Sequence, residues 1–350
     1  MRRTYTNHRS LNGRPRIGLA LGSGAARGWA HIGVIRQLAE MGIKPDVIAG
    51  SSVGGVVGGA YASGNLDEFE KWVSDMGRMD IIRLLDAKMT GGGFLKGSSL
   101  MAAIEDQIGD RNIEDLETPF GCVATELGTG REVWLADGSL LDACRASIAL
   151  PGVVAPFRRS DNSLLVDGGL VNPVPVSLAR ALGADFVIAV NLNGDLVGHH
   201  FWQIMPEDEP GQDLDDEEEE PVVSQDSTIA RWADKMKTGL GVRRDAYISS
   251  LRKDETPDPG IFDVIVGSID IMQDRLTRSR MAGEPPDIHI KPRLSHIGLM
   301  NFDASAETIG EGRKATLRQQ EELENLSRLL KIADENQAEG DEEQPKSLAR

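Results

Sequence analysis

Asp46-Val47-Ile48-Ala49-Gly50-Ser51-Ser52-Val53-Gly54 is the stretch that decides the fold of this chain. Its apolar start predicts a strand over residues 46–50, and the small residues that follow predict a helix over 53–62. A G-x-S-x-G pattern between a strand and a helix is typical of a nucleophile elbow, in which Gly50 and Gly54 leave room for a sharp turn. We therefore expect Ser52 at the carboxyl end of a strand, beside a helix N-terminus that favours developing negative charge.

A second glycine-rich turn, Gly22-Ser23-Gly24-Ala25-Ala26-Arg27-Gly28, joins an apolar strand over 16–21 to a helix over 28–39. Together with the elbow this gives a β-α-β-α opening, which is typical of a parallel sheet with helical crossovers. The glycine spacing does not fit the dinucleotide pattern G-x-G-x-x-G, and the Lys-Ser/Thr ending of a nucleotide P-loop is missing. Beside an elbow serine, the turn is better interpreted as an oxyanion hole with N–H donors from Ser23, Gly24 and Ala25.

A serine nucleophile needs a base, and two kinds of residue could supply it. Asp167 follows an apolar strand over 164–166 and precedes Gly168 and Gly169; its ordinary pKa of about 3.9 would have to rise through burial. The histidines are His8, His31, His199, His200, His289 and His296. The last two flank a late strand and stay open as alternatives to Asp167, whereas His31 is expected to be structural.

Four blocks of sequence occur in a fixed order along the chain. They are residues 22–33 (Gly-Ser-Gly-Ala-Ala-Arg-Gly-Trp-Ala-His-Ile-Gly), 50–54 (Gly-Ser-Ser-Val-Gly), 147–152 (Ser-Ile-Ala-Leu-Pro-Gly) and 165–175 (Leu-Val-Asp-Gly-Gly-Leu-Val-Asn-Pro-Val-Pro). With these blocks the chain resembles the patatin-like phospholipase family, on its bacterial neuropathy-target-esterase side. The resemblance covers residues 15–193 tightly and 261–315 more loosely. It implies an α/β fold with three α/β/α layers and a mostly parallel central sheet.

The resemblance also implies a Ser-Asp dyad that works through an acyl-enzyme intermediate, with no metal and no cofactor. Ser52 would attack an ester carbonyl and Asp167 would accept its proton. The implied oxyanion hole comprises Gly22, Ser23, Gly24, Ala25, Arg27 and Gly28, and the motif glycines are Gly50, Gly54, Gly168 and Gly169. In this chain Ser23, Ala25 and Ala26 interrupt the glycine run that many relatives carry, but these small residues should preserve the turn.

The charge of the chain is concentrated in two segments. Residues 206–220 hold ten acidic and no basic residues, and residues 334–350 hold six acidic and two basic ones, so −14 of the net −17 lies there and −3 remains elsewhere. Such acidic runs are expected to be solvated and disordered. A nucleic-acid-binding protein needs a basic stripe, which this composition excludes.

Composition divides the 350 residues into five parts. These are a flexible arm (1–14), a catalytic domain (15–193), an acidic insertion (194–227), a C-terminal helical region packing on the core (228–333) and an acidic tail (334–350). Cys122 and Cys144 are predicted to be small core residues, because two cysteines make neither a disulfide framework nor a metal site.

Periodicity predicts the remaining elements. Helices are expected over 98–109, 140–148, 227–251, 261–281 and 304–332, with a further one ending at 182; strands are expected over 120–125, 132–135, 185–190 and 287–290.

Two segments bear on membrane contact. Residues 47–66 carry no charge, but six glycines and the elbow serine favour a buried segment over a membrane span. In residues 229–240, Trp232, Met236 and Leu240 share one helical face, which suits either an interfacial helix or one packed on the protein. Because Met1-Arg2-Arg3 is followed by no apolar run, we expect a cytoplasmic protein, with peripheral contact at the inner membrane face as a further option.

The residues and the resemblance together lead us to expect a serine esterase, and the resemblance implies acyl esters of lysophospholipids or phospholipids as its substrates. The alternatives are a His-assisted α/β-hydrolase, a catalytically silent member of the same fold, and a nucleotide-binding protein.

Overall fold

The computed structural model describes residues 14–84, 98–195 and 261–342. The chain divides into two compact units, one formed by residues 1–200 with 268–350 and the other by residues 201–267. The first unit holds the central sheet and the candidate site. The predicted acidic insertion, apart from its first two residues, and the predicted helix over 227–251 with its amphipathic segment 229–240 lie outside the described residues.

A mixed, mostly parallel sheet forms the centre of the first unit. Its strands are β1 (Ile17–Leu21), β2 (Val47–Ser51), β3 (Phe120–Glu126), β4 (Glu132–Leu135), β5 (Phe157–Arg158), β6 (Leu164–Asp167), β7 (Phe186–Val190) and β8 (Ile288–Ile290). They follow the order β5-β6-β3-β2-β1-β7-β8, with β4 paired to β3. The pairs β1–β2, β1–β7, β2–β3 and β7–β8 are parallel, and those of β3 with β4 and β6 and of β5 with β6 are antiparallel.

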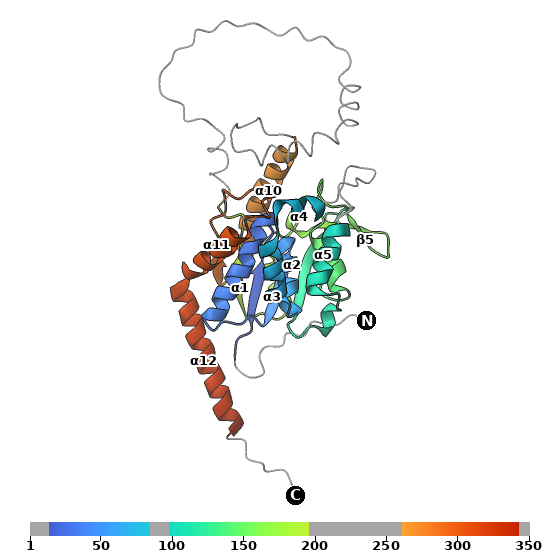
Figure 1. Ribbon diagram of the computed structural model, residues 1–350. Helices are drawn as coiled ribbons and strands as arrows, with labels where there is room; N and C mark the ends of the chain where they lie inside the picture. The colour runs from blue at the N-terminus through green and yellow to red at the C-terminus, as the bar shows by residue number, and fades with distance from the viewer. Residues whose placement is uncertain (1–13, 85–97, 196–260, 343–350) are drawn as a thin grey trace, which may run out of the picture. The chain divides into compact units, whose positions relative to one another are not determined.

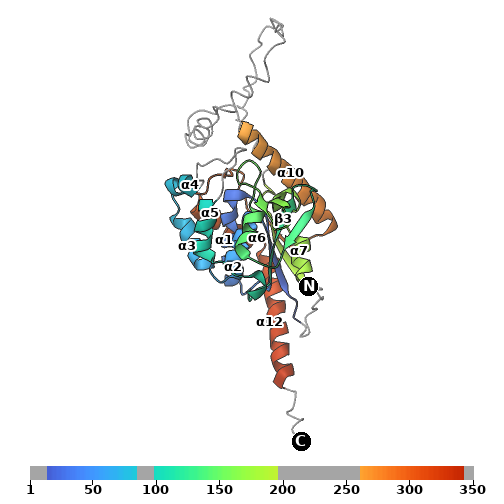
Figure 2. The same ribbon diagram turned by 90° about the vertical axis from the view of Figure 1, so that its right-hand side faces the viewer.

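Helices cover both faces of this sheet, so the predicted three-layer α/β/α fold is confirmed. They are the 3-10 turns η1 (Ala25–Trp29), η2 (Ile113–Asp115) and η3 (Gly168–Leu170), and the helices α1 (Ala30–Glu40), α2 (Val53–Ala62), α3 (Leu66–Asp75), α4 (Arg78–Leu84), α5 (Ser98–Ile108), α6 (Leu140–Ser147), α7 (Val176–Ala181), α10 (Ile261–Gly283), α11 (Ser305–Leu317) and α12 (Gln320–Glu342). Figure 1 shows α1, α2, α3 and α5 in front of the sheet, and Figure 2 shows α7 on the opposite side.

Side chains along β1 alternate between the two faces of the sheet, which explains why the hydrophobic core has two layers. Ile17, Leu19 and Leu21 point into a large apolar cluster with α1, α2 and α3, whereas Ala20 points into a second cluster against α7. Successive strand residues face opposite sides, so a strand buried on both faces reads as a continuous apolar run. Small side chains on the α7 side let that helix approach the sheet closely.

The central strand β3 brings two distant segments to adjacent positions. Val123 is the Cα partner of Ser51 at the end of β2, and the next residue, Ala124, is the partner of Asp167 at the end of β6. This register places the residue after Ser51 beside Asp167 although 115 positions separate them along the chain.

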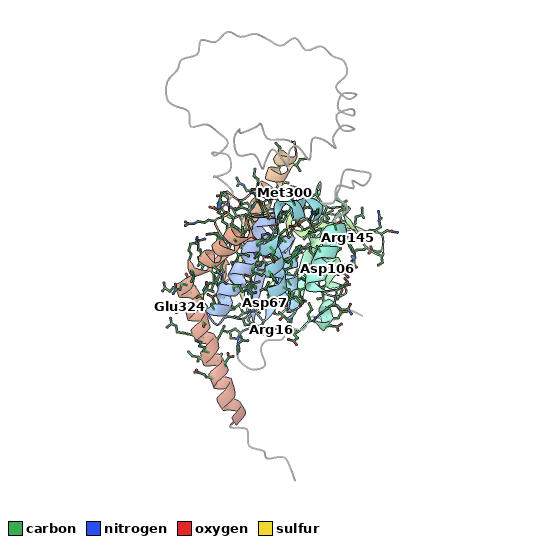
Figure 3. The ribbon with its side chains drawn as sticks, in the orientation of Figure 1. Arg16, Asp67, Asp106, Arg145, Met300 and Glu324 are labelled. Atoms are coloured by element: carbon green, nitrogen blue, oxygen red, sulfur yellow. The ribbon has the colours of Figure 1, made fainter. Side chains whose placement is uncertain are left out.

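The turns that follow β1 and β2 can be assigned to one end of the first unit. Figure 3 shows Arg16, which directly precedes β1, and Met300 at opposite ends of the unit. Leu299, next to Met300, accepts a hydrogen bond from the Ala26 N–H of η1 at 3.1 Å. The turns that follow β1 and β2 therefore lie at the Met300 end.

The final helix predicted over 304–332 is wrong in one respect, because the structure divides it into α11 and α12. The Gln319 N–H donates to the Thr316 carbonyl, which tightens the chain between the two helices. This change of direction lets α11 pack on α1 while Leu323, Leu326 and Leu330 of α12 reach the core. Helix α12 also continues to Glu342, past the predicted start of an acidic tail at residue 334.

Close packing of α1 on α11 depends on two glycines. A Cβ on Gly33 would lie 1.9 Å from the Ile309 carbonyl oxygen, and one on Gly312 would lie 2.0 Å from the Ala30 carbonyl oxygen. Backbone therefore meets backbone at this crossing. Gly310, two residues before Gly312 on the same helix, has no heavy atom within 4 Å of its Cβ position.

We expect Gly312→Ala to lower the free energy of unfolding by about 2–3 kcal/mol, since the new methyl forces the two helices apart. Gly310→Ala is the matched control; it should raise stability by about 0.5–1 kcal/mol, because alanine is the better helix former. Urea denaturation followed by circular dichroism measures both. Equal effects of the two substitutions would contradict this account of the crossing.

Candidate active site

Ser52 occupies a strained turn between β2 and α2. Its backbone angles are φ 54° and ψ −127°, in a region that residues with a side chain rarely adopt. A Cβ on Gly50 would lie 2.4 Å from the Gly55 Cα, and one on Gly54 would lie 2.2 Å from the Leu21 carbonyl oxygen. Glycine at both positions is therefore a steric condition for this turn.

The Ser52 hydroxyl faces Asp167. Ser52 Oγ donates a hydrogen bond of 2.6 Å to Asp167 Oδ2, and the Gly169 N–H donates one of 2.7 Å to Asp167 Oδ1. Asp167 is 1% exposed and Ser52 is 9% exposed. Both carboxylate oxygens are thus held, and one of them is aimed at the serine.

Burial changes the pKa of the Asp167 carboxyl group. Loss of solvent raises the pKa of Asp167 from its ordinary value of 3.8 to about 6, against the opposing effect of the hydrogen bonds from Ser52 and Gly169. The group remains ionised near neutral pH, yet it is a far better proton acceptor than an exposed aspartate.

Two hydroxyl side chains support this pair. Ser147 Oγ accepts a hydrogen bond from the Ser52 N–H at 2.8 Å and donates one to the Val123 carbonyl at 2.7 Å. Thr125 Oγ1 donates to the Asp167 carbonyl at 2.8 Å. Ser147 lies in one of the blocks that the sequence singled out, but nothing local in the sequence indicates these roles for it or for Thr125.

The loop over residues 22–28 lies against the elbow. A Cβ on Gly28 would be 2.2 Å from Val53 Cγ2, and one on Gly169 would be 3.0 Å from Ser23 Cβ. The loop therefore contacts the residue that follows Ser52 as well as the turn that follows Asp167.

Backbone donors in this loop differ from the prediction in one respect. The Ser23 N–H donates to the Pro173 carbonyl at 2.8 Å and the Gly22 N–H to the Val190 carbonyl at 3.0 Å, so neither is available to a substrate oxygen. Gly24 and Ala25, in contrast, donate from their N–H groups to no residue that the structure describes. Ala25 has φ 48°, which indicates strain at the point where these donors are presented.

The Arg27 side chain anchors the loop over residues 22–28 to the interior of the protein. The side chain is fully buried, and its guanidinium donates to Asp270 Oδ2 at 2.7 Å and to Asn193 Oδ1 at 3.0 Å. Gln273, one helical turn beyond Asp270, accepts from Ser23 Oγ at 2.8 Å. The sequence analysis missed Asn193, Asp270 and Gln273, because only the tertiary fold brings β7 and α10 to this loop.

None of the histidines that the structure describes is hydrogen-bonded to Ser52. His31 bonds through Nε2 to the Gly22 carbonyl oxygen, and burial lowers its pKa to about 4, so its role is structural. His289 lies on β8, three strands from β2 and hence roughly 14 Å away, and the exposed His296 pairs with Glu307. His8, His199 and His200 lie outside the described residues.

The described part of the chain holds neither a metal-binding cluster nor a membrane-spanning helix. There, no group of three His, Cys, Asp or Glu side chains is arranged to hold a metal ion. Cys122 and Cys144 are buried free thiols. Across the same residues, no helix has both the length and the apolar character needed to cross a membrane.

Comparison with known proteins identifies the fold family. A family model described as patatin-like phospholipase matches residues 19–180, a range that contains Ser52, Asp167 and the loop over 22–28. An uncharacterized NTE family protein of Mycobacterium tuberculosis is 36% identical over 344 residues, covering 85% of this chain and 89% of the relative. The chain belongs to the patatin-like phospholipase family. The prediction from the four sequence blocks is thereby confirmed.

Other members of the patatin-like phospholipase family share one part of the chain. A patatin-like phospholipase domain-containing protein of Caenorhabditis elegans is 38% identical over 182 residues, which is 50% of this chain and 13% of the relative. The solved structure of VipD from Legionella pneumophila covers 89% of this chain with 11% identity and a TM-score of 0.41, too low to support an argument. Family membership implies lipid acyl hydrolase activity.

Proposed function

We propose that this patatin-like protein is a serine esterase that cleaves acyl esters of lysophospholipids or phospholipids with Ser52 and Asp167 as its dyad. The observation that carries the proposal is the 2.6 Å hydrogen bond from the Ser52 hydroxyl to the buried Asp167 carboxylate. A serine in a strained elbow with a base in hydrogen-bond reach is the arrangement of an activated nucleophile.

Acylation follows from this geometry. Ser52 Oγ attacks the ester carbonyl carbon while its proton moves to Asp167 Oδ2, and the carbonyl oxygen becomes an oxyanion. The N–H groups of Gly24 and Ala25 are the proposed donors to this oxyanion, with the N-terminus of α2 adding favourable potential. Collapse of the tetrahedral intermediate breaks the ester C–O bond, and the leaving alkoxide takes the proton from Asp167.

Deacylation repeats the steps with water. Asp167 accepts a proton from a water molecule as the water oxygen attacks the acyl carbon. Collapse then breaks the bond to Ser52 Oγ, which recovers the proton from Asp167 and leaves a free fatty acid. No metal or organic cofactor enters either half of the cycle.

The proposed substrate class is inferred from family membership and not from the residues of the site. Patatin-like phospholipases act on lipid esters, so we propose a lipid ester substrate met either as a monomer or by peripheral contact with the inner face of the membrane, in the cytoplasm. Liposome pelleting over a series of lipid charges, with the full-length protein, separates these two routes.

Active-site labelling tests the proposal directly. We expect a fluorophosphonate to add to the wild-type protein once, at Ser52, as found by peptide mass spectrometry, and lysophosphatidylcholine to yield free fatty acid. A protein that hydrolyses esters without modification at Ser52 would contradict the dyad. A protein that neither reacts nor hydrolyses any ester would be a catalytically silent member of the family.

The pH dependence of turnover is a further prediction. Because Asp167 must be ionised to accept the proton and burial places its pKa at about 6, kcat/KM should fall tenfold per pH unit below about pH 6. Above pH 7 the profile should be flat. Initial rates on a neutral p-nitrophenyl ester between pH 4.5 and 8.5 measure it; an acidic limb near pH 4 would show that the carboxylate is not desolvated in solution.

A further inference from the structure

Helix α10 presents a polar face to the interior of the first unit. Asp270, Gln273, Asp274 and Thr277 are each between 1% and 8% exposed and follow one another at helical spacing. Buried polar side chains lower stability unless they are hydrogen-bonded, so a helix with such a face needs specific partners. For Asp270 and Gln273 those partners belong to the candidate active site.

Gln273 joins three loops through one amide. Its Oε1 accepts from Ser23 Oγ at 2.8 Å in the loop after β1 and from Asn193 Nδ2 at 2.9 Å after β7. On the other side, a Cβ on Gly169 would lie 2.4 Å from Gln273 Nε2 and 3.0 Å from Asp167 Oδ1. The same side chain therefore touches the loop of proposed oxyanion donors and the turn that carries the proposed base.

A chain of hydrogen bonds fixes the orientation of this amide. An arginine side chain can only donate, so Arg27 requires the Oδ1 atom of Asn193 to face it. Asn193 must then turn its Nδ2 donors towards Gln273, which in turn must offer Oε1. The Nε2 donors of Gln273 are left pointing towards Gly169, and they bond no residue that the structure describes.

The Arg27–Asp270 ion pair holds this chain of hydrogen bonds in place. Arg27, fully buried, lies 2.7 Å from Asp270 Oδ2, and its own N–H donates to the Gly24 carbonyl. Separating a buried charged pair leaves one charge uncompensated, so the pair resists displacement of the loop. The loop needs such support, because Ala25 has a positive φ and Gly24 and Ala25 must be held at a fixed distance from Ser52.

We propose that Gln273 is a positioning residue for catalysis, which holds the Gly24 and Ala25 N–H groups in place through Ser23, while the Arg27–Asp270 pair fixes its orientation through Asn193. The inference rests on the proposed esterase function. It assigns to α10, through a residue 221 positions beyond Ser52 in the chain, a direct part in aligning the oxyanion loop with the nucleophile.

Gln273→Met tests the proposal, since methionine has nearly the same shape and cannot accept the two hydrogen bonds. We expect kcat for a p-nitrophenyl ester and the rate of fluorophosphonate labelling to fall about 10- to 100-fold, with KM within about threefold, because misplaced donors weaken the transition state and not substrate binding. Thr277→Val is the matched control. Thr277 is buried on the same face, and among the described residues its hydroxyl bonds only the Gln273 carbonyl, so this variant should keep kcat within about twofold.

Gln273→Glu gives a second, independent readout. A carboxylate keeps both acceptor bonds, so kcat at pH 8 should stay within about fivefold of wild type. Its negative charge near Asp167 should, however, move the acidic limb of the kcat/KM profile to higher pH by about half a unit or more. An unmoved limb would show that residue 273 lies too far from Asp167 to help align the site.

The outcomes separate this inference from the proposed function. Labelling of wild-type Ser52 together with unchanged labelling rate and kcat in folded Gln273→Met would overturn the positioning role alone. Absence of labelling in the wild type would overturn the proposed function first. If Gln273→Met fails to fold, an unshifted acidic limb in Gln273→Glu would decide against the proposal.

Discussion

Ser52→Ala should abolish covalent labelling by fluorophosphonates and lower ester turnover by about 10⁴-fold or more, because no other group in the site can form the acyl-enzyme. The fold should survive. Within the part of the chain that the structure describes, the Ser52 hydroxyl makes one hydrogen bond, to the Asp167 carboxylate, which should still accept from the Gly169 N–H in the variant. Intact-mass spectrometry after labelling and initial rates on a p-nitrophenyl ester measure the two effects.

Ser51→Ala is the matched control for this experiment. Ser51 is the preceding residue, fully buried at the end of β2, and its Oγ has no hydrogen-bond partner in the described part of the chain. Labelling and turnover should therefore stay within about twofold of wild type. Comparable losses in Ser51→Ala and Ser52→Ala would point to damage of the elbow instead of loss of a nucleophile.

Asp167→Asn should lower turnover by about 10³-fold, since an amide cannot accept the serine proton. The hydrogen-bond pattern survives this change, because the amide oxygen can accept from Gly169 N–H while the amide nitrogen donates to Ser52 Oγ. Slow labelling by fluorophosphonates should persist. Rapid-quench labelling and steady-state rates distinguish this result from that of Ser52→Ala.

The same variant should be more stable than the wild type near neutral pH. In the folded protein the pKa of Asp167 is raised from 3.8 to about 6, so folding at pH 7.5 buries an ionised carboxylate at a cost on the order of 3 kcal/mol. The cost shrinks as pH falls through 6 and is absent below about 3.8, where the carboxyl is protonated in both states. Asparagine removes the cost.

Thermal denaturation at pH 8 and pH 5 checks the sign. The midpoint for Asp167→Asn should exceed that of the wild type at pH 8, and the difference should be about half as large at pH 5, because the linkage cost vanishes only below about pH 3.8. A variant that is less stable by the same amount at both pH values would show that the Asp167 carboxylate is not buried at a cost. Loss of activity with gain of stability is the pattern expected of a strained active site.

Local patterns in the sequence were sufficient for much of this account. The apolar run before Gly50-Ser51-Ser52-Val53-Gly54 and the small residues after it predict the strand, turn and helix that the structure contains. Glycine at 50 and 54 follows from the absence of space at those positions, which is a property of the turn itself. Asp167 could be named as one candidate base, because it ends an apolar strand and is followed by two glycines; its choice over a simple turn or a histidine came from the family resemblance.

The remaining features of the site depend on contacts between segments that lie far apart in the sequence. The hydrogen bond of Ser23 N–H to Pro173 and the support that Ser147 gives to Ser52 join segments whose separation no local pattern reveals. Helix α10 likewise shows its polar face in the sequence, but only the fold shows that Asp270 and Gln273 meet Arg27 and Ser23.

The sequence by itself determined the elbow and the candidate nucleophile Ser52, because the steric demands of that turn lie within a few residues. It singled out Asp167 only through the resemblance of four ordered blocks to a known family. Only the tertiary structure decided that the two side chains lie 2.6 Å apart and that burial raises the pKa of Asp167. It also decided that the Ser23 N–H is bonded to Pro173, whereas the Gly24 and Ala25 N–H groups donate to no residue in the described part of the chain. Distances, burial and hydrogen-bond partners arise from packing of the whole sheet around β3, which no short stretch of the chain encodes.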